Sequence, residues 1–232
     1  MTEPVERRRR AELDLRCYLV TSGTGRRTVE VAAAAAAAGA GVVQVRAKSV
    51  STAELLALTL AVAEAVERAR PATRVLVDDR ADVAFAAVRG GAHVHGVHLG
   101  ADDLPPRDAR ALLGPDAVVG FTTGTLALVQ AAQPLVNVVD YVGAGPFRPT
   151  PTKDSGRPPL GVDGYPPLVA ASQIPVVAIG DITPDDVPAL ARTGISGVAL
   201  VRAVMDAADP AAVVRLVVAA FGRCGGSALP VA

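Results

Sequence analysis

The strongest constraint on the fold of this chain is a regular alternation between short runs rich in Val, Leu and Ile and longer Ala-rich stretches. Alternation of strand-like and helix-like segments is typical of a parallel sheet whose strands are joined by helices. We recognise eight such units, and residues 52–70 and 210–221 are two of the clearest helix candidates. The expected strands cover residues 16–22, 41–48, 74–80, 96–100, 117–123, 140–147, 175–181 and 197–204.

Eight strand–helix units in 232 residues predict a single-domain (β/α)8 TIM barrel of the α/β class. The alternative is an open doubly wound sheet, which usually carries a Gly-rich dinucleotide-binding turn after its first strand. The run at 21–25, TSGTG, is a weak match because it lacks the third Gly at the required spacing. We expect the barrel to span residues 13–222, with a disordered charged tail over 1–12 and a flexible tail over 223–232.

The charge balance argues against large anionic partners. The 23 basic and 23 acidic residues cancel, which removes the positive field expected of a protein that binds nucleic acid or an anionic membrane. No apolar run approaches the roughly 20 residues of a membrane span, and no apolar signal segment follows the Arg run at 7–10. The two cysteines form no C-x-x-C motif, which suits a reducing cytoplasm. We therefore expect a cytoplasmic protein without nucleic-acid or membrane partners, and homo-oligomerisation stays open.

The second expected strand has one polar face. Because side chains alternate along a strand, Gln44, Arg46 and Lys48 share one face, and the apolar side chains between them share the other. The apolar face should contact the helices, so the polar face should point into the barrel or its mouth. A cation there is costly to desolvate unless it meets an anion. We favour a bound phosphate as that anion, and an ion pair with Asp or Glu is the alternative.

Two acidic doublets end neighbouring strands, at positions 78–79 and 102–103. Neighbouring residues of a strand face opposite ways, so one carboxylate of each doublet is enough to supply an inward ligand. Asp79 and Asp103 should approach each other at the same rim, and two carboxylates with room for water and phosphate are typical of a Mg²⁺ site. The alternative role for Asp103 is capping of the helix before Pro105.

The segment after the sixth strand, residues 143–156, is rich in Gly and Pro. Glycines permit close approach of the backbone to a ligand, and the hydroxyls of Thr150 and Thr152 beside Lys153 are donors for phosphate oxygens. We therefore expect a positioned phosphate-binding loop, with a plain surface loop as the alternative. The three histidines at 93, 95 and 98 do not share one strand face, so we do not expect them to form a metal site.

These motifs occur together, and in the same order, in a known family. From residue 15 to about residue 221 the chain resembles thiamin phosphate synthases. The resemblance is carried by VQVRAK at 43–48, VDDRADVA at 77–84, GVHLGADDLP at 96–105, DYVGAGP at 140–146, PTPTK at 149–153, AIG at 178–180 and VALVRAV at 198–204.

The resemblance implies a TIM-barrel transferase that uses Mg²⁺ to join hydroxymethylpyrimidine diphosphate to a thiazole phosphate, giving thiamin phosphate and diphosphate. The implied reaction is dissociative, so it depends on stabilising the charge of the departing diphosphate. By resemblance, Lys153, Arg46 and Lys48 are the catalytic cations, and Asp79 and Asp103 bind the metal. The implied substrate-binding residues are Gln44, Arg46, Lys48, Asp78, Thr122, Thr150, Thr152, Lys153, Asp181, Val201 and Arg202.

The chain departs from the family pattern at four positions. Asp78 replaces Asn, Ala101 replaces Gln, Gly124 replaces a common His, and Asp181 replaces the second Gly of a phosphate loop. The carboxylate at 181 would repel a phosphate, and Arg202 on the next strand is placed to offset it. These departures leave two alternatives open: a thiazole tautomerase-like isomerase, and a non-catalytic paralogue that binds a phosphorylated ligand.

Overall fold

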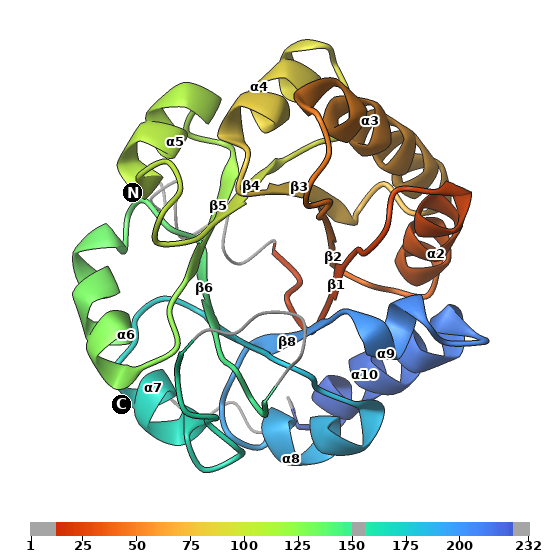
Figure 1. Ribbon diagram of the computed structural model, residues 1–232. Helices are drawn as coiled ribbons and strands as arrows, with labels where there is room; N and C mark the ends of the chain where they lie inside the picture. The colour runs from red at the N-terminus through yellow and green to blue at the C-terminus, as the bar shows by residue number, and fades with distance from the viewer. Residues whose placement is uncertain (1–12, 150–155, 225–232) are drawn as a thin grey trace, which may run out of the picture.

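The computed structural model of this protein describes residues 13–149 and 156–224, and their strands form a closed parallel barrel in sequence order (Figure 1). Closure is set by β8, which pairs with β1 as well as with β7. The predicted TIM barrel is therefore confirmed, and the open doubly wound sheet was the wrong alternative. The strands are β1 (Cys17–Val20), β2 (Val42–Val45), β3 (Arg74–Asp78), β4 (Gly96–Leu99), β5 (Val118–Thr122), β6 (Tyr141–Ala144), β7 (Val176–Ile179) and β8 (Gly197–Leu200).

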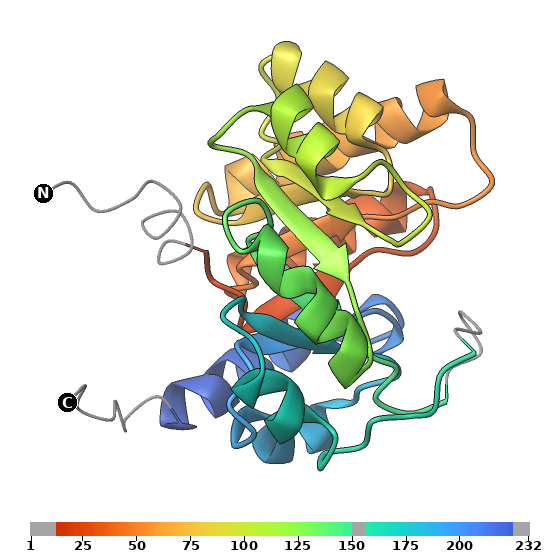
Figure 2. The same cartoon turned by 90° about the vertical axis from the view of Figure 1, so that its left-hand side faces the viewer.

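The helices surround the barrel, and the side view shows α6 lying outside the strands (Figure 2). Local sequence starts several of them: Ser51 and Glu54 form a reciprocal capping box at the start of α3. The helices are α2 (Arg26–Ala37), α3 (Thr52–Ala69), α4 (Ala81–Arg89), α5 (Pro106–Leu113), α6 (Leu126–Ala132), α7 (Tyr165–Ala170), α8 (Val187–Ala191), α9 (Arg202–Met205) and α10 (Pro210–Cys224), with short 3-10 turns η1 (Gln133–Leu135) and η2 (Pro184–Asp186). Within residues 13–149 and 156–224, no helix is both long and apolar enough to cross a membrane.

The strands carry two cores because each has two buried faces. Val43 and Val45 belong to the larger cluster, between the strands and the helices. Val42 belongs to the smaller cluster, which fills the barrel interior together with Tyr18 and Tyr141. The alternation predicted for the second strand is thus confirmed, and Gln44 shares the interior face with Val42.

The strands end earlier than the sequence pattern predicted. β2 stops at Val45, so Arg46 and Lys48 lie on the loop after it. The expected eighth strand covered residues 197–204, but β8 stops at Leu200 and the chain turns into α9 at Arg202. Hydrophobic pattern alone does not show where a barrel strand stops pairing with its neighbours.

At the chain ends, the expected tail over 1–12 and residues 225–232 lie outside the described residues, while 223 and 224 belong to α10.

Candidate active site at the barrel mouth

A cavity of about 630 Å³, which we call the central cavity, lies at the carboxyl-terminal ends of the strands. This is the end of a TIM barrel where active sites lie. The predicted residues Thr150, Thr152 and Lys153 lie outside the described residues. The other predicted site residues all line the central cavity: Gln44, Arg46, Lys48, Asp78, Asp79, Asp103, Thr122, Asp181, Val201 and Arg202.

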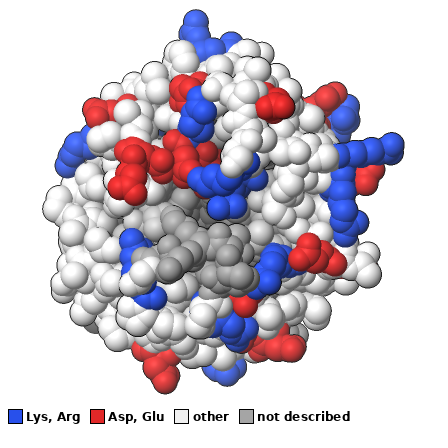
Figure 3. Space-filling view, in the orientation of Figure 1, with Lys and Arg blue, Asp and Glu red and all other residues white. Residues whose placement is uncertain are grey.

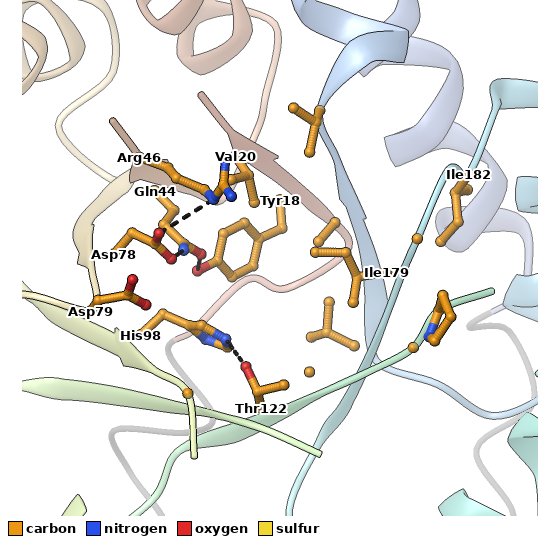
Figure 4. A pocket seen from close by; sticks show the side chains of 18 of the residues that line it. Tyr18, Val20, Gln44, Arg46, Asp78, Asp79, His98, Thr122, Ile179 and Ile182 are labelled. Atoms are coloured by element: carbon orange, nitrogen blue, oxygen red, sulfur yellow. Dashed lines mark hydrogen bonds and ion pairs between the residues drawn. The ribbon is translucent and has the colours of Figure 1, made fainter. Parts of the chain in front are cut away.

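The cations after β2 are held by carboxylates from β3. Arg46 Nε lies 3.4 Å from Asp78 Oδ2 (Figure 4). Lys48 Nζ lies 3.4 Å from the same oxygen. Lys48 also donates a hydrogen bond to Asp79. Figure 3 shows acidic and basic side chains side by side at this opening. Ion pairs are therefore present, as the alternative interpretation of this strand predicted. A diphosphate carries more negative charge than one carboxylate, so it can compete with these carboxylates for the two cations.

Both carboxylates of the 78–79 doublet line the central cavity, whereas strand alternation required only one. The strand ends at Asp78, and Asp79 adopts a left-handed backbone with φ of 61°. That turn breaks the alternation and brings the second carboxylate to the same opening. Burial and the carboxylate of Asp79 raise the pKa of Asp78 to about 6, outweighing the opposite effects of Lys48 and Arg46.

Asp79 and Asp103 meet at the rim, as the sequence predicted. They lie close enough for each to shift the other's pKa, and burial together with Asp79 raises the pKa of Asp103. Burial also acts to raise the pKa of Asp79, but Lys48 and Asp103 lower it overall. Asp103 accepts a 2.6 Å hydrogen bond from the backbone of Gly100, and α5 has no side-chain cap, so Asp103 does not cap that helix.

This pair fits a divalent cation. Two neighbouring carboxylates that line the same opening offer a pair of hard oxygen ligands to Mg²⁺. No group of three or more His, Cys, Asp or Glu side chains with metal-site geometry occurs in residues 13–149 and 156–224. The described part of the chain would therefore supply two ligands, and water and substrate phosphate would supply others.

Three polar aromatic residues that the sequence analysis did not select, Tyr18, His98 and Tyr141, form the floor of the central cavity. Tyr18 donates a 2.5 Å hydrogen bond to Gln44 Oε1 and lies 2.7 Å from the hydroxyl of Tyr141. His98 joins the Tyr141 hydroxyl, 2.9 Å from Nδ1, to the hydroxyl of Thr122, 3.0 Å from Nε2. Strand alternation could have identified Tyr18 from the sequence, because Tyr18 and Val20 lie two positions apart on one face of β1 and both line the central cavity.

The other two histidines lie elsewhere. The rings of His93 and His95 contact each other edge to face at 4.4 Å between centroids. His93 contacts the carbonyl of Thr73, and His95 accepts a hydrogen bond from the backbone of Val75. Burial lowers the pKa of His95 to about 3, which keeps it neutral. His98 alone of the three histidines lines the central cavity.

Two departures from the family pattern have structural counterparts. Arg202 donates to the carboxylate of Asp181, which is the offset that the sequence predicted. At Gly124, a methyl group would come within 2.3 Å of the Gly145 carbonyl and 2.8 Å of Arg157 Nη1. Arg157 therefore lies where a side chain at position 124 would project, and it donates to the carbonyl of Thr123.

Comparison with known proteins agrees with this geometry. The thiamine monophosphate synthase family model matches residues 17–204. A thiamine-phosphate synthase of Corynebacterium jeikeium is 61% identical over 213 residues, covering 92% of this chain and 97% of the relative. One of Corynebacterium efficiens is 58% identical over 211 residues, covering 90% and 96%.

A solved structure also matches most of the chain. The thiamine phosphate pyrophosphorylase of Pyrococcus furiosus superposes with a TM-score of 0.79 at 29% sequence identity, covering 93% of this chain and all of that one. The residues matched by the family model, 17–204, include all eight strands of the barrel. The predicted resemblance is confirmed, and the chain is an enzyme that belongs to the thiamine monophosphate synthase family of transferases.

Proposed function

We propose that this enzyme joins hydroxymethylpyrimidine diphosphate to a thiazole phosphate and releases thiamin phosphate and diphosphate. One observation carries the proposal: the cations Arg46 and Lys48 and the carboxylate pair Asp79–Asp103 line the same opening of the central cavity. A diphosphate needs both kinds of group, because its charge is neutralised by cations directly and through a bound metal. The substrates are small molecules, and we place the reaction in the cytoplasm.

The proposed reaction is dissociative. The bond between the pyrimidine methylene and the diphosphate breaks with its electron pair going to the diphosphate oxygen. The aminopyrimidine ring stabilises the resulting cation, and the thiazole nitrogen then donates its lone pair to the methylene carbon. Such a reaction needs little general base but strong stabilisation of charge on the leaving group.

The roles of the residues follow from this demand. Arg46 and Lys48 would exchange their carboxylate partners for diphosphate oxygens, and Lys153 would contact the same group. Gln44 and Thr122 would hold the pyrimidine. Thiazole phosphate binding would fall to Thr150, Thr152, Asp181, Val201 and Arg202, and the last three line the central cavity.

We propose Mg²⁺ as the cofactor, held by Asp79 and Asp103. When bound, it would neutralise part of the negative charge that develops on the departing diphosphate. Lys48 already donates to Asp79, so this ammonium lies next to the proposed metal ligands. It is therefore placed to contact the same diphosphate.

The test is a reconstituted reaction. Purified protein is mixed with the pyrimidine diphosphate, thiazole phosphate and Mg²⁺. The amounts of thiamin phosphate and of diphosphate are then measured over time. Parallel reactions omit one substrate or replace Mg²⁺ with EDTA. We expect both products to form at the same rate, and neither to form without metal.

Two other outcomes would replace the proposal. Isomerised thiazole without diphosphate release would indicate a tautomerase, which has no use for a diphosphate site. Tight binding of a phosphorylated substrate without any turnover would indicate a non-catalytic paralogue. The ion pair between Arg202 and Asp181 favours the non-catalytic alternative, because Arg202 is a cation that should bind the thiazole phosphate and it is already paired with a carboxylate.

A further inference from the structure

The side chains on the floor of the central cavity form one continuous chain of hydrogen bonds across the barrel. It starts at the Asp78 carboxylate, which accepts from Gln44 Nε2, and ends at Thr122. Between the two ends, Gln44 contacts Tyr18 (Figure 4). Tyr18 contacts Tyr141, and Tyr141 contacts His98. Six different strands or strand ends contribute one residue each, so the chain spans the interior from β3 to β5. We call it the floor relay.

Chemistry fixes the direction of its first links. An ionised carboxylate can only accept hydrogen bonds, so the Gln44 amide must turn its NH₂ group to Asp78 and its oxygen to Tyr18. The Tyr18 hydroxyl therefore donates to Gln44. Since a phenol has one hydrogen, Tyr18 then accepts from Tyr141. Burial raises the pKa of both tyrosines, so both keep the proton that this arrangement uses.

The remaining hydrogen bonds of the relay run in the same direction to Thr122. The Tyr141 hydroxyl donates its single hydrogen to Tyr18, so it accepts a hydrogen bond from Nδ1–H of His98. In neutral His98, Nε2 is then unprotonated and accepts the hydrogen of the Thr122 hydroxyl. The Thr122 hydroxyl therefore donates its hydrogen to His98, and its oxygen can accept a hydrogen bond from a ligand in the central cavity.

The backbone is shaped to make room for this relay. At Gly120 on β5, an added methyl group would lie 2.2 Å from the Tyr141 hydroxyl and 2.5 Å from His98 Nδ1. Tyr18 and Tyr141 are each 1% exposed and Gln44 is 4% exposed, so water cannot easily replace a lost partner in the middle of the relay.

We propose that Tyr18, Tyr141 and His98 are positioning residues, and that Asp78 sets the donor-to-acceptor direction of the hydrogen bonds that join them. Through these hydrogen bonds they present the Thr122 oxygen as an acceptor for the amino group of the aminopyrimidine. This inference rests on the proposed function. The amino group becomes a stronger hydrogen-bond donor as the ring takes up positive charge, so an acceptor there stabilises the transition state more than the bound substrate. The relay therefore acts on kcat more than on binding.

The direction of the relay is tested by ¹⁵N NMR of histidine-labelled protein, which needs no turnover. The chain has three histidines, and the signals of His98 are those lost in His98→Gln. We expect a protonated Nδ1 and an unprotonated Nε2 in His98. In Asp78→Asn, whose amide can donate as well as accept, we expect a mixture of tautomers. An Nε2–H tautomer in the wild type, or no change in Asp78→Asn, would overturn the direction that we infer.

The role in catalysis is tested with Tyr141→Phe, which keeps the ring and removes the hydroxyl. The matched control is Tyr165→Phe, because the buried hydroxyl of Tyr165 donates a 3.1 Å hydrogen bond to the Ala144 carbonyl, outside the relay. We expect kcat to fall about tenfold in Tyr141→Phe, equivalent to about 1.4 kcal/mol, with the KM of the thiazole phosphate unchanged. We also expect His98 to shift toward the Nε2–H tautomer, and Tyr165→Phe to retain both kcat and the tautomer.

The two readouts separate this inference from the proposed function. Equal kcat values for the two Tyr→Phe variants would overturn the role of the relay even if thiamin phosphate is formed. Absence of thiamin phosphate in the wild type would overturn the proposed function, and the NMR result would still decide the direction of the relay. Should Tyr141→Phe fail to fold, Tyr18→Phe breaks the relay at the preceding link, with the same expected fall in kcat.

Discussion

The guanidinium of Arg202, at the start of α9, donates a hydrogen bond to the carboxylate of Asp181, in the turn after β7. Both side chains line the central cavity. Asp181 adopts a left-handed backbone with φ of 54°, a conformation that Gly adopts without strain. A carboxylate thus stands where the family pattern has Gly, and it pairs with the cation that the proposed thiazole phosphate would need.

Replacing Asp181 with Gly should strengthen binding of the thiazole phosphate. The substitution frees Arg202 and removes a charge that repels phosphate by roughly 3 kcal/mol per charge pair at about 5 Å. We expect the KM of the thiazole phosphate to fall at least tenfold and the KM of the pyrimidine diphosphate to stay the same. Steady-state kinetics with each substrate varied in turn measures both values. Asp181→Asn, which keeps the shape but loses the charge, should show the same direction, and a raised KM in both variants would contradict the argument.

Lys153→Ala should slow the reaction. Removing one preorganised donor to a developing charge typically lowers the rate by roughly 10²- to 10³-fold, about 2.7 to 4 kcal/mol. Single-turnover measurement of diphosphate release isolates the affected step. The control is Arg89→Ala, because Arg89 is an exposed cation on the outer helix α4. Near wild-type turnover in Lys153→Ala would remove that residue from the proposed site.

Asp79→Asn and Asp103→Asn should each weaken Mg²⁺ binding. Loss of a direct ligand should exceed the roughly 10- to 100-fold effect typical of residues that only support a ligand. Titration of activity with Mg²⁺, and calorimetry of Mg²⁺ binding in the presence of diphosphate, measure this change. Asp116→Asn makes the same charge change at an exposed position before β5 and should leave Mg²⁺ affinity unaltered. Unchanged Mg²⁺ affinity in both site variants would place the metal elsewhere.

Asp78→Asn should stabilise the protein at alkaline pH. The pKa of Asp78 is about 6 in the folded protein against 3.8 for the free side chain, so the folded state binds a proton more tightly than the unfolded chain. The ionised carboxylate therefore destabilises the fold above pH 6, by up to about 3 kcal/mol. That cost declines as the pH falls through 6 and disappears below about 4.

Urea unfolding of wild type and Asp78→Asn at pH 8 and pH 5 measures this cost. We expect Asp78→Asn to be the more stable protein at pH 8, and the difference between the two to shrink at pH 5. A difference that does not change with pH would show that Asp78 titrates normally.

Several features of the site are predictable because they depend on short-range geometry. Alternation along β2 places Gln44 inside the barrel and Val43 outside it, and the structure agrees. The approach of Asp79 and Asp103 follows from the adjacency of β3 and β4 in any such barrel. Strand ends were less predictable, because pairing with neighbouring strands decides where β8 stops.

The sequence by itself determined the order of strands and helices, and it placed Arg46, Asp79 and Asp103 at the strand ends, because periodicity and spacing are local properties of the chain. Only the tertiary structure decided which of those groups touch. Tyr18 and Tyr141 are 123 positions apart and meet at 2.7 Å, and Asp78 binds Gln44 from another strand. Hydrogen bonds depend on differences of a few tenths of an ångström, and only packing of all eight strands around one interior sets distances on that scale.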